Sequence, residues 1–472
     1  MRAAWSTLAF VVIGCGSDPM LRPIIDTPPA SSAGFPYVGI DEVSLAVAEA
    51  GDEGNLRVAD FQLGDAPRLT NVPFGRDLVV HMSARIAGSI SAYGRTCAFD
   101  YEAGGQPNDP HLYLARVGRF AEAELGLSAS PRGVFAWAMP DGGAGFVGGG
   151  IRLARYDVGT AVYEEIDTRL DRDRAAYVPL EDGRLLVIGG EDPEGGAVGE
   201  ITAIDLRAVP GPDAPLDSTS MQAMSSAFGA ALTDGSAIVA GGESGGLSLG
   251  TAHRVEITNA GIVTESIMPG LAYPRADAVM TRLGDGPAAD VLVTGGIDTS
   301  MALAVPEVEI YRPLPRKFVT VPGAVLAAAR WGHKAVPLPD SSVLVIGGYT
   351  APGVTTPLIE LFERSTNEFR TLGDLDARAG RVDMTVTALP DGRILIAGGL
   401  DADGAPTSAA FIARQDLQSG TFSLLETDPM AAPRSGHEAV LLCDGTVLIV
   451  GGTDDDGAPI AERYNPPPDG RR

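Results

Sequence analysis

A pair of adjacent glycines follows an apolar run seven times in this chain. The pairs are Gly148-Gly149, Gly189-Gly190, Gly241-Gly242, Gly295-Gly296, Gly347-Gly348, Gly398-Gly399 and Gly451-Gly452. Their first glycines are separated by 41, 52, 54, 52, 51 and 53 residues. A period of about 50 residues indicates supersecondary units that bury their apolar faces by packing on neighbouring copies. Most of the chain is therefore expected to form an array of similar units.

Each repeat is predicted to form four short antiparallel strands. The apolar run at 343–346 is typical of a buried strand, and Asp-Gly pairs such as Asp391-Gly392 are typical of a tight hairpin turn. A third strand carries a large apolar residue such as Phe362, and a fourth strand follows. This repeat resembles the kelch repeat over roughly residues 119–466. The resemblance implies an all-β fold, a seven-bladed kelch-type β-propeller.

The two ends of the repeat region are expected to pair. The seventh repeat finishes near Tyr464 without a fourth strand, whereas residues 119–127, before the first repeat, look like the fourth strand at 421–425. We predict that 119–127 supplies the outer strand of the last unit. Such pairing would remove the open edge of the ring.

The amino terminus has the order of an export signal. One arginine precedes an apolar stretch over 3–13, and the sequence of residues 12–15 resembles the lipobox of bacterial lipoproteins. This resemblance implies that 1–15 is a lipoprotein signal peptide and that Cys15 carries the lipid. Residues 16–36, rich in proline and small residues, are expected to form a flexible tether.

Residues 37–118 lack the glycine-pair repeat but contain stretches that alternate apolar and polar residues. We expect a small β-sandwich-like domain there, of the immunoglobulin-like or carbohydrate-module kind, with a degenerate extra blade as the alternative. Residues 467–472 are expected to form a tail.

Two cysteines remain after Cys15. Cys97 and Cys443 lie far apart in the sequence and in different predicted domains. We expect two separate thiols, and a disulfide is the alternative that an oxidising compartment would allow.

Arginines recur at a similar repeat position, just before the first predicted strand. They are Arg132, Arg275, Arg330 and Arg434. If they converge on one face of the ring, they could bind a carboxylate ligand bidentately. The alternative is a structural role in which each arginine ties neighbouring blades to loop carbonyls.

Two matching loops contain alternating aspartates and a glycine. The aspartates are Asp401 and Asp403 in one loop and Asp454 and Asp456 in the other. Carboxylates on a tight loop suit calcium, although the full twelve-residue calcium loop is absent and Asp-Gly is also ordinary hairpin chemistry. Calcium is the one cofactor that the sequence raises.

The charge and the missing motifs restrict the function. A net charge of -26 argues against nucleic acid and anionic lipid as partners, so the membrane is expected to be contacted through the lipid anchor alone. We find no glycine-rich phosphate loop, paired-cysteine zinc pattern or nucleophile elbow in the sequence. We expect a monomeric, non-catalytic binding or scaffold lipoprotein of the bacterial cell envelope, at the periplasmic or surface face of the outer membrane. Its loops would present a surface to a protein or glycan.

The alternative function is that of an envelope carbohydrate-active enzyme. Some kelch propellers, such as galactose oxidase and bacterial sialic acid mutarotases, are enzymes, and a mutarotase, lyase or oxidase site would lie in the central pocket. A copper-radical site needs two histidines, two tyrosines and a crosslinked cysteine. His333 and His437 occupy the same position in their repeats, so structural repetition explains them better than metal ligation.

Overall fold

The structure is a computed structural model in which every described element is a β-strand or a turn. It describes residues 20–51, 54–62, 67–102, 109–123, 133–148, 153–160, 162–166, 170, 172–206, 216–415, 422–452 and 460–468. None of these residues is helical, so no helix in this part of the chain is long and apolar enough to cross a membrane. The all-β prediction is confirmed.

The repeat region forms seven four-stranded antiparallel sheets within the described residues. The first three are β12 (Val134–Ala138), β13 (Ala144–Gly148), β14 (Ala154–Asp157) and β15 (Val162–Glu165); β16 (Ala176–Pro179), β17 (Leu185–Ile188), β18 (Glu200–Ile204) and β19 (Leu216–Ser220); and β20 (Phe228–Ala231), β21 (Ala237–Ala240), β24 (Ala252–Thr258) and β25 (Gly261–Ser266). The next three are β26 (Val279–Arg282), β27 (Val291–Thr294), β30 (Glu307–Arg312) and β31 (Lys317–Val325); β32 (Lys334–Pro337), β33 (Val343–Ile346), β36 (Leu358–Glu363) and β37 (Glu368–Asp374); and β38 (Thr385–Ala388), β39 (Ile394–Ala397), β40 (Ala410–Gln415) and β41 (Phe422–Thr427). The last sheet contains β42 (Glu438–Leu441), β43 (Val447–Val450), β44 (Ala461–Asn465) and β11 (Arg119–Glu122).

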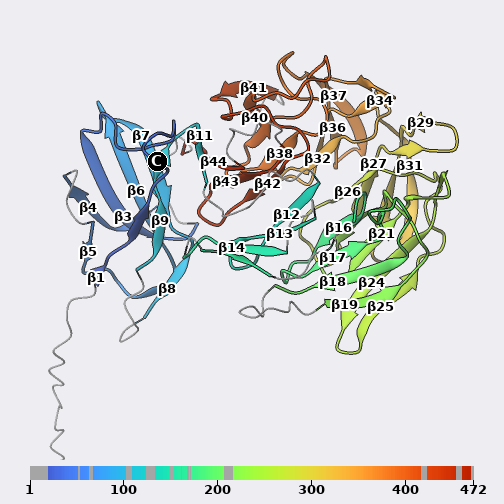
Figure 1. Cartoon of the computed structure of the whole chain (residues 1–472), viewed down its shortest axis with the longest axis horizontal. Coiled ribbons are helices and arrows are strands. Elements are labelled where there is room, and N and C mark those ends of the chain that lie inside the picture. The colour runs from blue at the N-terminus through green and yellow to red at the C-terminus, as the bar shows by residue number, and fades with distance from the viewer. Residues whose placement is uncertain are drawn as a thin grey trace, which may run out of the picture.

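The first strands of these sheets contact one another in a cycle. The contacts run through β12, β16, β20, β26, β32, β38 and β42, and β42 contacts β12 again. The second strand of each sheet is buried over its length, as at β17, β33 and β43. The fold is therefore β-propeller-like, with the sheets arranged in a ring (Figure 1).

The ring closes through strands from both ends of the repeat region. Strand β11 pairs antiparallel with β44, with Arg119 opposite Asn465 and Glu122 opposite Glu462. The rings of Phe120 and Tyr464 pack 4.7 Å apart between centroids. The predicted contribution of the 119–127 segment to the last sheet is confirmed for the residues of β11.

Glycine pairs such as Gly295-Gly296 lie where neighbouring sheets approach closely. Gly295 and Gly296 have φ of 57° and 98°, in the left-handed region that favours glycine. A Cβ on Gly295 would lie 2.3 Å from the carbonyl oxygen of Arg330 in the next repeat. The amide of Gly296 donates to that same carbonyl at 2.9 Å. Any larger residue would therefore separate the two sheets.

The N-terminal part forms a six-stranded sheet with the path β10-β7-β6-β3-β4 and β8 paired to β6. Its strands are β3 (Glu42–Glu49), β4 (Asn55–Phe61), β6 (Gly75–Ile86), β7 (Ser89–Arg95), β8 (Phe99–Tyr101) and β10 (Ala115–Arg116). One face packs into its own core, which includes Val43, Leu45, Val80 and Met82. The strand number and order differ from those of the repeat sheets, so this sheet is not a further copy of the repeat.

The flexible tether predicted for residues 16–36 is wrong from Met20 onward. Strand β1 (Met20–Leu21) pairs with β5 (Leu69–Thr70), and β2 (Ile24–Asp26) pairs in parallel with β9 (His111–Tyr113). The side chain of Leu21 is buried in the core of the N-terminal sheet. Apolar residues between the prolines provide this anchoring, which the proline content obscured. Cys15 lies outside the described residues.

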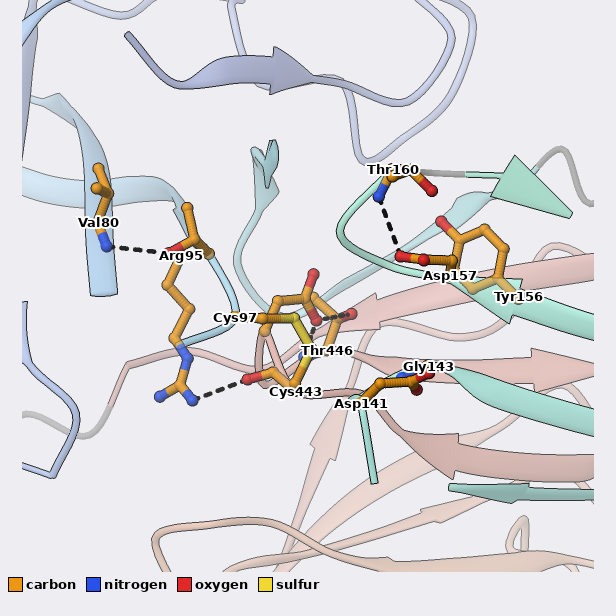
Figure 2. The surroundings of a disulfide bond; sticks show 12 residues. Val80, Arg95, Cys97, Asp141, Gly143, Tyr156, Asp157, Thr160, Cys443 and Thr446 are labelled. Carbon is orange, nitrogen blue, oxygen red and sulfur yellow. Dashed lines mark hydrogen bonds between the residues drawn. A yellow bond between two sulfur atoms is a disulfide. The ribbon is translucent and has the colours of Figure 1, made fainter. Parts of the chain in front are cut away.

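A disulfide joins the N-terminal sheet to the ring (Figure 2). Cys97, just after β7, is bonded to Cys443, in the turn between β42 and β43. Arg95 Nη2 donates to the Cys443 carbonyl oxygen at 2.9 Å. The expectation of two separate thiols is therefore wrong. The two cysteines are 346 residues apart in the sequence but close in space, because ring closure returns the last sheet to the N-terminal part.

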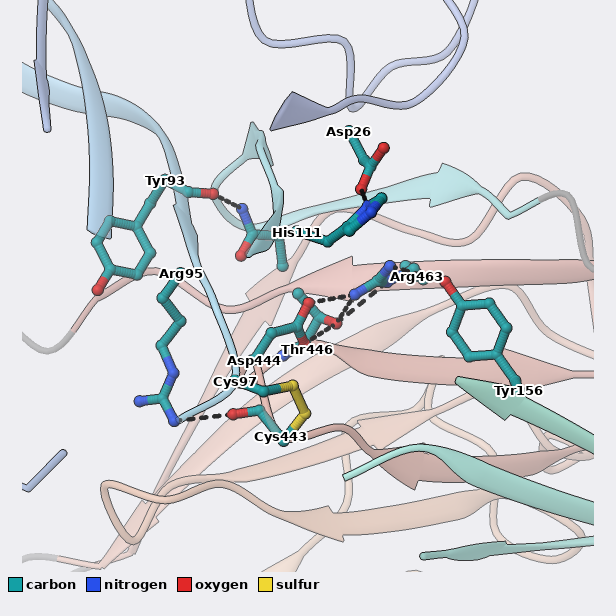
Figure 3. A network of polar contacts seen from close by, with 11 residues as sticks. Asp26, Tyr93, Arg95, Cys97, His111, Tyr156, Cys443, Asp444, Thr446 and Arg463 are labelled. Atoms are coloured by element: carbon teal, nitrogen blue, oxygen red, sulfur yellow. Dashed lines mark hydrogen bonds and ion pairs between the residues drawn. A yellow bond between two sulfur atoms is a disulfide. The ribbon is translucent and has the colours of Figure 1, made fainter. Parts of the chain in front are cut away.

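Arg463 on β44 holds three parts of the molecule together (Figure 3). Its guanidinium pairs with Asp444 and lies 3.9 Å from the ring centroid of Tyr113 on β9, in the N-terminal part. It also donates to the hydroxyl of Tyr156 on β14 at 3.4 Å. Burial raises the pKa of Tyr113 to about 12, so this phenol stays neutral beside the cation. The junction is therefore fixed by contacts beyond the disulfide.

Candidate functional site

Three of the four predicted ligand-binding arginines form buried ion pairs with glutamates of the same sheet. The pairs are Arg275–Glu309, Arg330–Glu360 and Arg434–Glu462. All three guanidinium groups are fully buried. Arg275 shows the pattern: its Nη2 donates to Glu309 at 3.0 Å, and its Nη1 donates to the carbonyls of Gly295 at 2.9 Å and Glu307 at 2.8 Å.

The expected binding of a carboxylate ligand by these arginines is not supported, because the chain supplies the carboxylate itself. The glutamates are also held in place, since Glu360 accepts the amide of Ala327 at 2.6 Å. The backbone carbonyl of Arg330 accepts the amide of Gly296 from the preceding repeat at 2.9 Å. Each arginine thus connects two sheets, as the structural alternative predicted. Arg132 lies outside the described residues.

Two further arginines occupy the position four residues before a first strand. Arg172, before β16, donates to Glu200 at 2.5 Å and to Thr202 at 2.9 Å. Arg381, before β38, accepts the amide of Gly348 at its carbonyl at 2.7 Å. Their constant offset from the strand was the sequence signal that would have identified them.

The predicted calcium loop at Asp401 and Asp403 is a hydrogen-bonded turn. One carboxylate oxygen of Asp401 accepts the amides of Asp403 at 2.9 Å and Ala405 at 3.0 Å. This use of the carboxylate fits the hairpin alternative. No group of three or more His, Cys, Asp or Glu residues suited to a metal occurs in the part of the chain that the structure describes. Asp454 and Asp456 lie outside that part.

The repeated histidines are buried between sheets. His333 and His437 are each 2% exposed, and their Nε2 atoms lie 2.9 Å from Thr294 Oγ1 and 3.1 Å from Thr385 Oγ1. Burial lowers the pKa of both imidazoles to about 3, and the nearby charges of Arg330 and Arg434 add to this effect. Both histidines are therefore neutral at pH 7, which agrees with a structural role.

These histidines should make the fold less stable in acid. Their folded-state pKa of about 3 lies below the unfolded value of 6.5, so the unfolded chain binds the proton first as the pH falls. The contribution of each histidine to stability is complete above the unfolded pKa of 6.5 and falls by about 1.4 kcal/mol per pH unit from there down to the folded pKa of about 3. Urea unfolding at a series of pH values should show a shallower decline for His437→Gln than for the parent chain. Identical slopes would contradict this assignment.

A cavity of about 520 Å³ lies between the first strands of four successive sheets. Residues of β20, β26, β32 and β38, the turns after the last three of these strands and Ile394 line it. Most of the wall is alanine, proline, leucine and glycine. The charged side chains in the wall neutralise each other, because Arg282 donates to Asp285 at 2.9 Å and to Glu181 at 2.6 Å. This wall suits the packing of a ligand better than proton transfer to one.

The opposite ends of the first strands carry a rim of left-handed residues. Six residues, each two positions before a first strand, have φ between 51° and 63°: Arg174, Ser226, Asp277, Gly332, Asp383 and Gly436. The amide of Ser226 donates to the carbonyl of Arg174 at 2.8 Å, and the amide of Asp277 donates to that of Ser226 at 3.1 Å. The rim therefore joins neighbouring sheets through the backbone. Sequence reasoning missed it because the residue type varies.

The Arg174 side chain organises the polar groups of this rim. Its Nε donates to Ser226 Oγ at 2.9 Å, and its two Nη atoms pair with Glu191 at 2.7 Å and Glu243 at 2.8 Å. The protein around Asp277 displaces water from its carboxyl, which raises the pKa of that group. The arginine is thus committed to carboxylates of the chain.

Three short ribbons follow the glycine pairs at 241–242, 295–296 and 347–348. They are β22 (Glu243–Ser244) with β23 (Leu247–Ser248), β28 (Ile297–Asp298) with β29 (Leu303–Ala304), and β34 (Tyr349–Ala351) with β35 (Val354–Thr355). Neighbouring ribbons contact each other, β23 with β28 and β29 with β34. Figure 1 shows β29 and β34 at the opposite end of the molecule from the N-terminal sheet.

The ribbons present aliphatic side chains to solvent. Leu247 is 60% exposed, Met301 65%, Leu303 59% and Val354 53%. Hydrogen bonds fix the first two ribbons against each other: the amide of Thr299 donates to Ser248 Oγ at 2.8 Å, and the two hydroxyls lie 3.0 Å apart. We call this set of three ribbons the ribbon platform. Grouped exposed apolar side chains are typical of interaction sites.

The ribbon platform is acidic as well as apolar. Residues 243–248, 297–304 and 349–355 contain Glu243 and Asp298 and no lysine or arginine. The corresponding loops of the neighbouring repeats, at 191–197 and 400–406, add five carboxylates and again no basic residue. Arg174 pairs with two of these carboxylates, Glu191 and Glu243, so the negative charge that remains on and beside the platform comes from the aspartates and Glu194. That remaining charge would attract a positively charged partner.

No protein-family model matches the sequence, and no curated protein matches it. Among solved structures the chain is similar to the structure of YjhT, with a TM-score of 0.46 and 14% sequence identity. The match covers 62% of this chain and 94% of that chain.

Proposed function

We propose that the protein is a non-catalytic binding lipoprotein of the bacterial cell envelope, built as a seven-bladed kelch-type β-propeller with a small β-sandwich-like domain before it. The seven sheets, their cyclic contacts and the strand that closes the ring support this architecture. The Cys97–Cys443 disulfide supports export, because disulfides persist in oxidising compartments. Cys15 would carry the lipid that anchors the chain to the outer membrane.

The ribbon platform is the observation that carries the binding function. Its four exposed aliphatic side chains stand on ribbons that contact one another, so they form a surface that needs little ordering on binding. By contrast, the cavity between the first strands is lined mostly by alanine, proline, leucine and glycine, and its two charged side chains, Arg282 and Asp285, are paired with each other. This contrast favours binding over the carbohydrate-active enzyme that remains the alternative.

The occupant that fits the ribbon platform best is a polypeptide segment with aliphatic and basic side chains. The exposed apolar side chains of the platform suit leucine and methionine of a partner, and the aromatic residue of the platform, Tyr349, packs on Trp331. Acidic residues on and beside the platform would pair with lysine or arginine of the partner and would speed its association.

Site-specific crosslinking in the cell envelope would test this proposal. A photoreactive amino acid at Leu303 should crosslink the full-length lipoprotein to one discrete partner, and Leu247→Asp in the same chain should reduce the yield at least about tenfold. The matched control is Val263, 51% exposed on the outer strand β25, where no discrete product is expected. Equal crosslinked products from Leu303 and Val263 would show that the ribbon platform is not the binding surface. Turnover of sugars or polysaccharide fragments by the purified protein would overturn the non-catalytic assignment.

A further inference from the structure

The N-terminal sheet has a cavity on the face that points away from its core. The cavity has a volume of about 400 Å³, within the range of small-molecule sites. Side chains from four neighbouring strands line it: β3, β4, β6 and β7. Each of the four strands contributes polar side chains to this wall.

Strand periodicity makes this face polar. On β6, Ser83 and Arg85 line the cavity. The residue before each of them, Met82 or Ala84, is buried in the core on the other face. Strand β3 alternates in the same way, with Ser44 in the cavity wall opposite both Ser83 and Asp60 in the strand register. Polar side chains from adjacent strands therefore lie side by side across the sheet.

Contacts among the lining residues hold them in place. Ser44 Oγ and Ser83 Oγ lie 2.8 Å apart, and Arg85 Nη1 donates to Ser83 Oγ at 3.2 Å. His81 Nδ1 lies 2.8 Å from the Tyr93 hydroxyl, and the two rings are stacked with centroids 6.1 Å apart. Asn465 of the last sheet donates to the Tyr93 carbonyl at 2.8 Å, so the cavity is also fixed relative to the ring.

We propose that this cavity binds a neutral carbohydrate. Its wall combines a guanidinium that donates hydrogen bonds, carboxylates that accept them and hydroxyls that can donate or accept. The hydroxyl groups of a sugar, which both donate and accept, can pair with all three kinds of group. Glu42 and Asp60 outnumber Arg85 among the charged lining residues, which disfavours an anionic ligand. The partly exposed ring of Tyr93, supported by the buried imidazole of His81, provides an aromatic surface on which a sugar ring would pack. This site is separate from the ribbon platform, so the two proposals stand or fall independently.

The test is binding of the whole chain after Cys15 to an array of neutral and acidic oligosaccharides. The parent chain should bind a subset of the neutral glycans. The variant Asn55→Ala/Asp60→Ala, which changes two exposed side chains, should weaken that binding at least about tenfold through lost hydrogen bonds. Arg57→Ala, on the same strand but outside the cavity lining, should leave binding unchanged.

Each other result would overturn the proposal. Failure to bind any neutral glycan would show that the cavity is not a carbohydrate site. Binding of acidic glycans alone would show that the ligand is not neutral. Equal affinity of the parent and Asn55→Ala/Asp60→Ala would place the sugar elsewhere on the molecule. Loss of binding in Arg57→Ala to the same degree as in the double variant would point to disturbance of the sheet rather than to loss of contacts.

Discussion

Glu360→Gln should lower the free energy of unfolding by about 3–5 kcal/mol, because it leaves the guanidinium of Arg330 buried without a counter-charge. Both side chains of the pair are fully buried. Arg330 keeps its bonds to the carbonyls of Gly347 at 2.9 Å and Leu358 at 2.8 Å, but these dipoles do not replace the lost charge. Urea unfolding of the purified chain would measure the change.

The matched control is Glu363→Gln on the same strand, β36. Glu363 pairs with Arg370 at 2.9 Å, and both side chains are partly exposed, at 34% and 43%. An exposed pair of this kind contributes at most about 1 kcal/mol. If Glu360→Gln lowered the free energy of unfolding no more than Glu363→Gln does, the stabilising role assigned to the buried pair would be contradicted. The double variant Arg330→Met/Glu360→Leu should recover most of the lost stability, because it removes both charges together.

The repeat was predictable because its cause is local. Glycine pairs, apolar strands and Asp-Gly turns act within a few residues, and the missing fourth strand after Tyr464 indicated the pairing with β11. The arginine pattern was visible too, but its role was not. That role depends on which residue of the third strand faces the arginine, and the register that places Glu309 and Glu360 there emerges only when the sheet forms.

The candidate surfaces were less predictable, for the same reason. The ribbon platform requires three loops from different repeats to meet, and each loop alone looks like an ordinary polar turn. The polar cavity of the N-terminal sheet requires the order of β4, β3, β6 and β7, which alternation along single strands does not specify. Contacts between residues far apart in the sequence, such as Asn465 and Tyr93, form only because ring closure brings the last sheet back to the N-terminal part.

Cys443→Ser should cause a loss of similar size to that of Glu360→Gln, located at the junction between the N-terminal sheet and the ring. The bond closes a loop of several hundred residues, and a crosslink of that length restricts the unfolded chain by roughly 5 kcal/mol in the loop-entropy account. The contacts of Arg463 with Tyr113 and of Asn465 with Tyr93 remain, so the sheet should stay docked in the native state.

Cys443→Ser is therefore expected to unfold at a lower temperature, without separation of the N-terminal sheet from the ring in the native state. Thermal unfolding of Cys443→Ser should begin at a lower temperature than that of the parent chain, and a reductant should lower the transition of the parent to the same point. Cys97→Ser is the matched control, because it removes the same bond from the other side. The double variant should match either single variant, since neither cysteine has a further crosslink to lose. A transition in the parent chain that does not respond to reductant would show that the two sulfur atoms are not bonded.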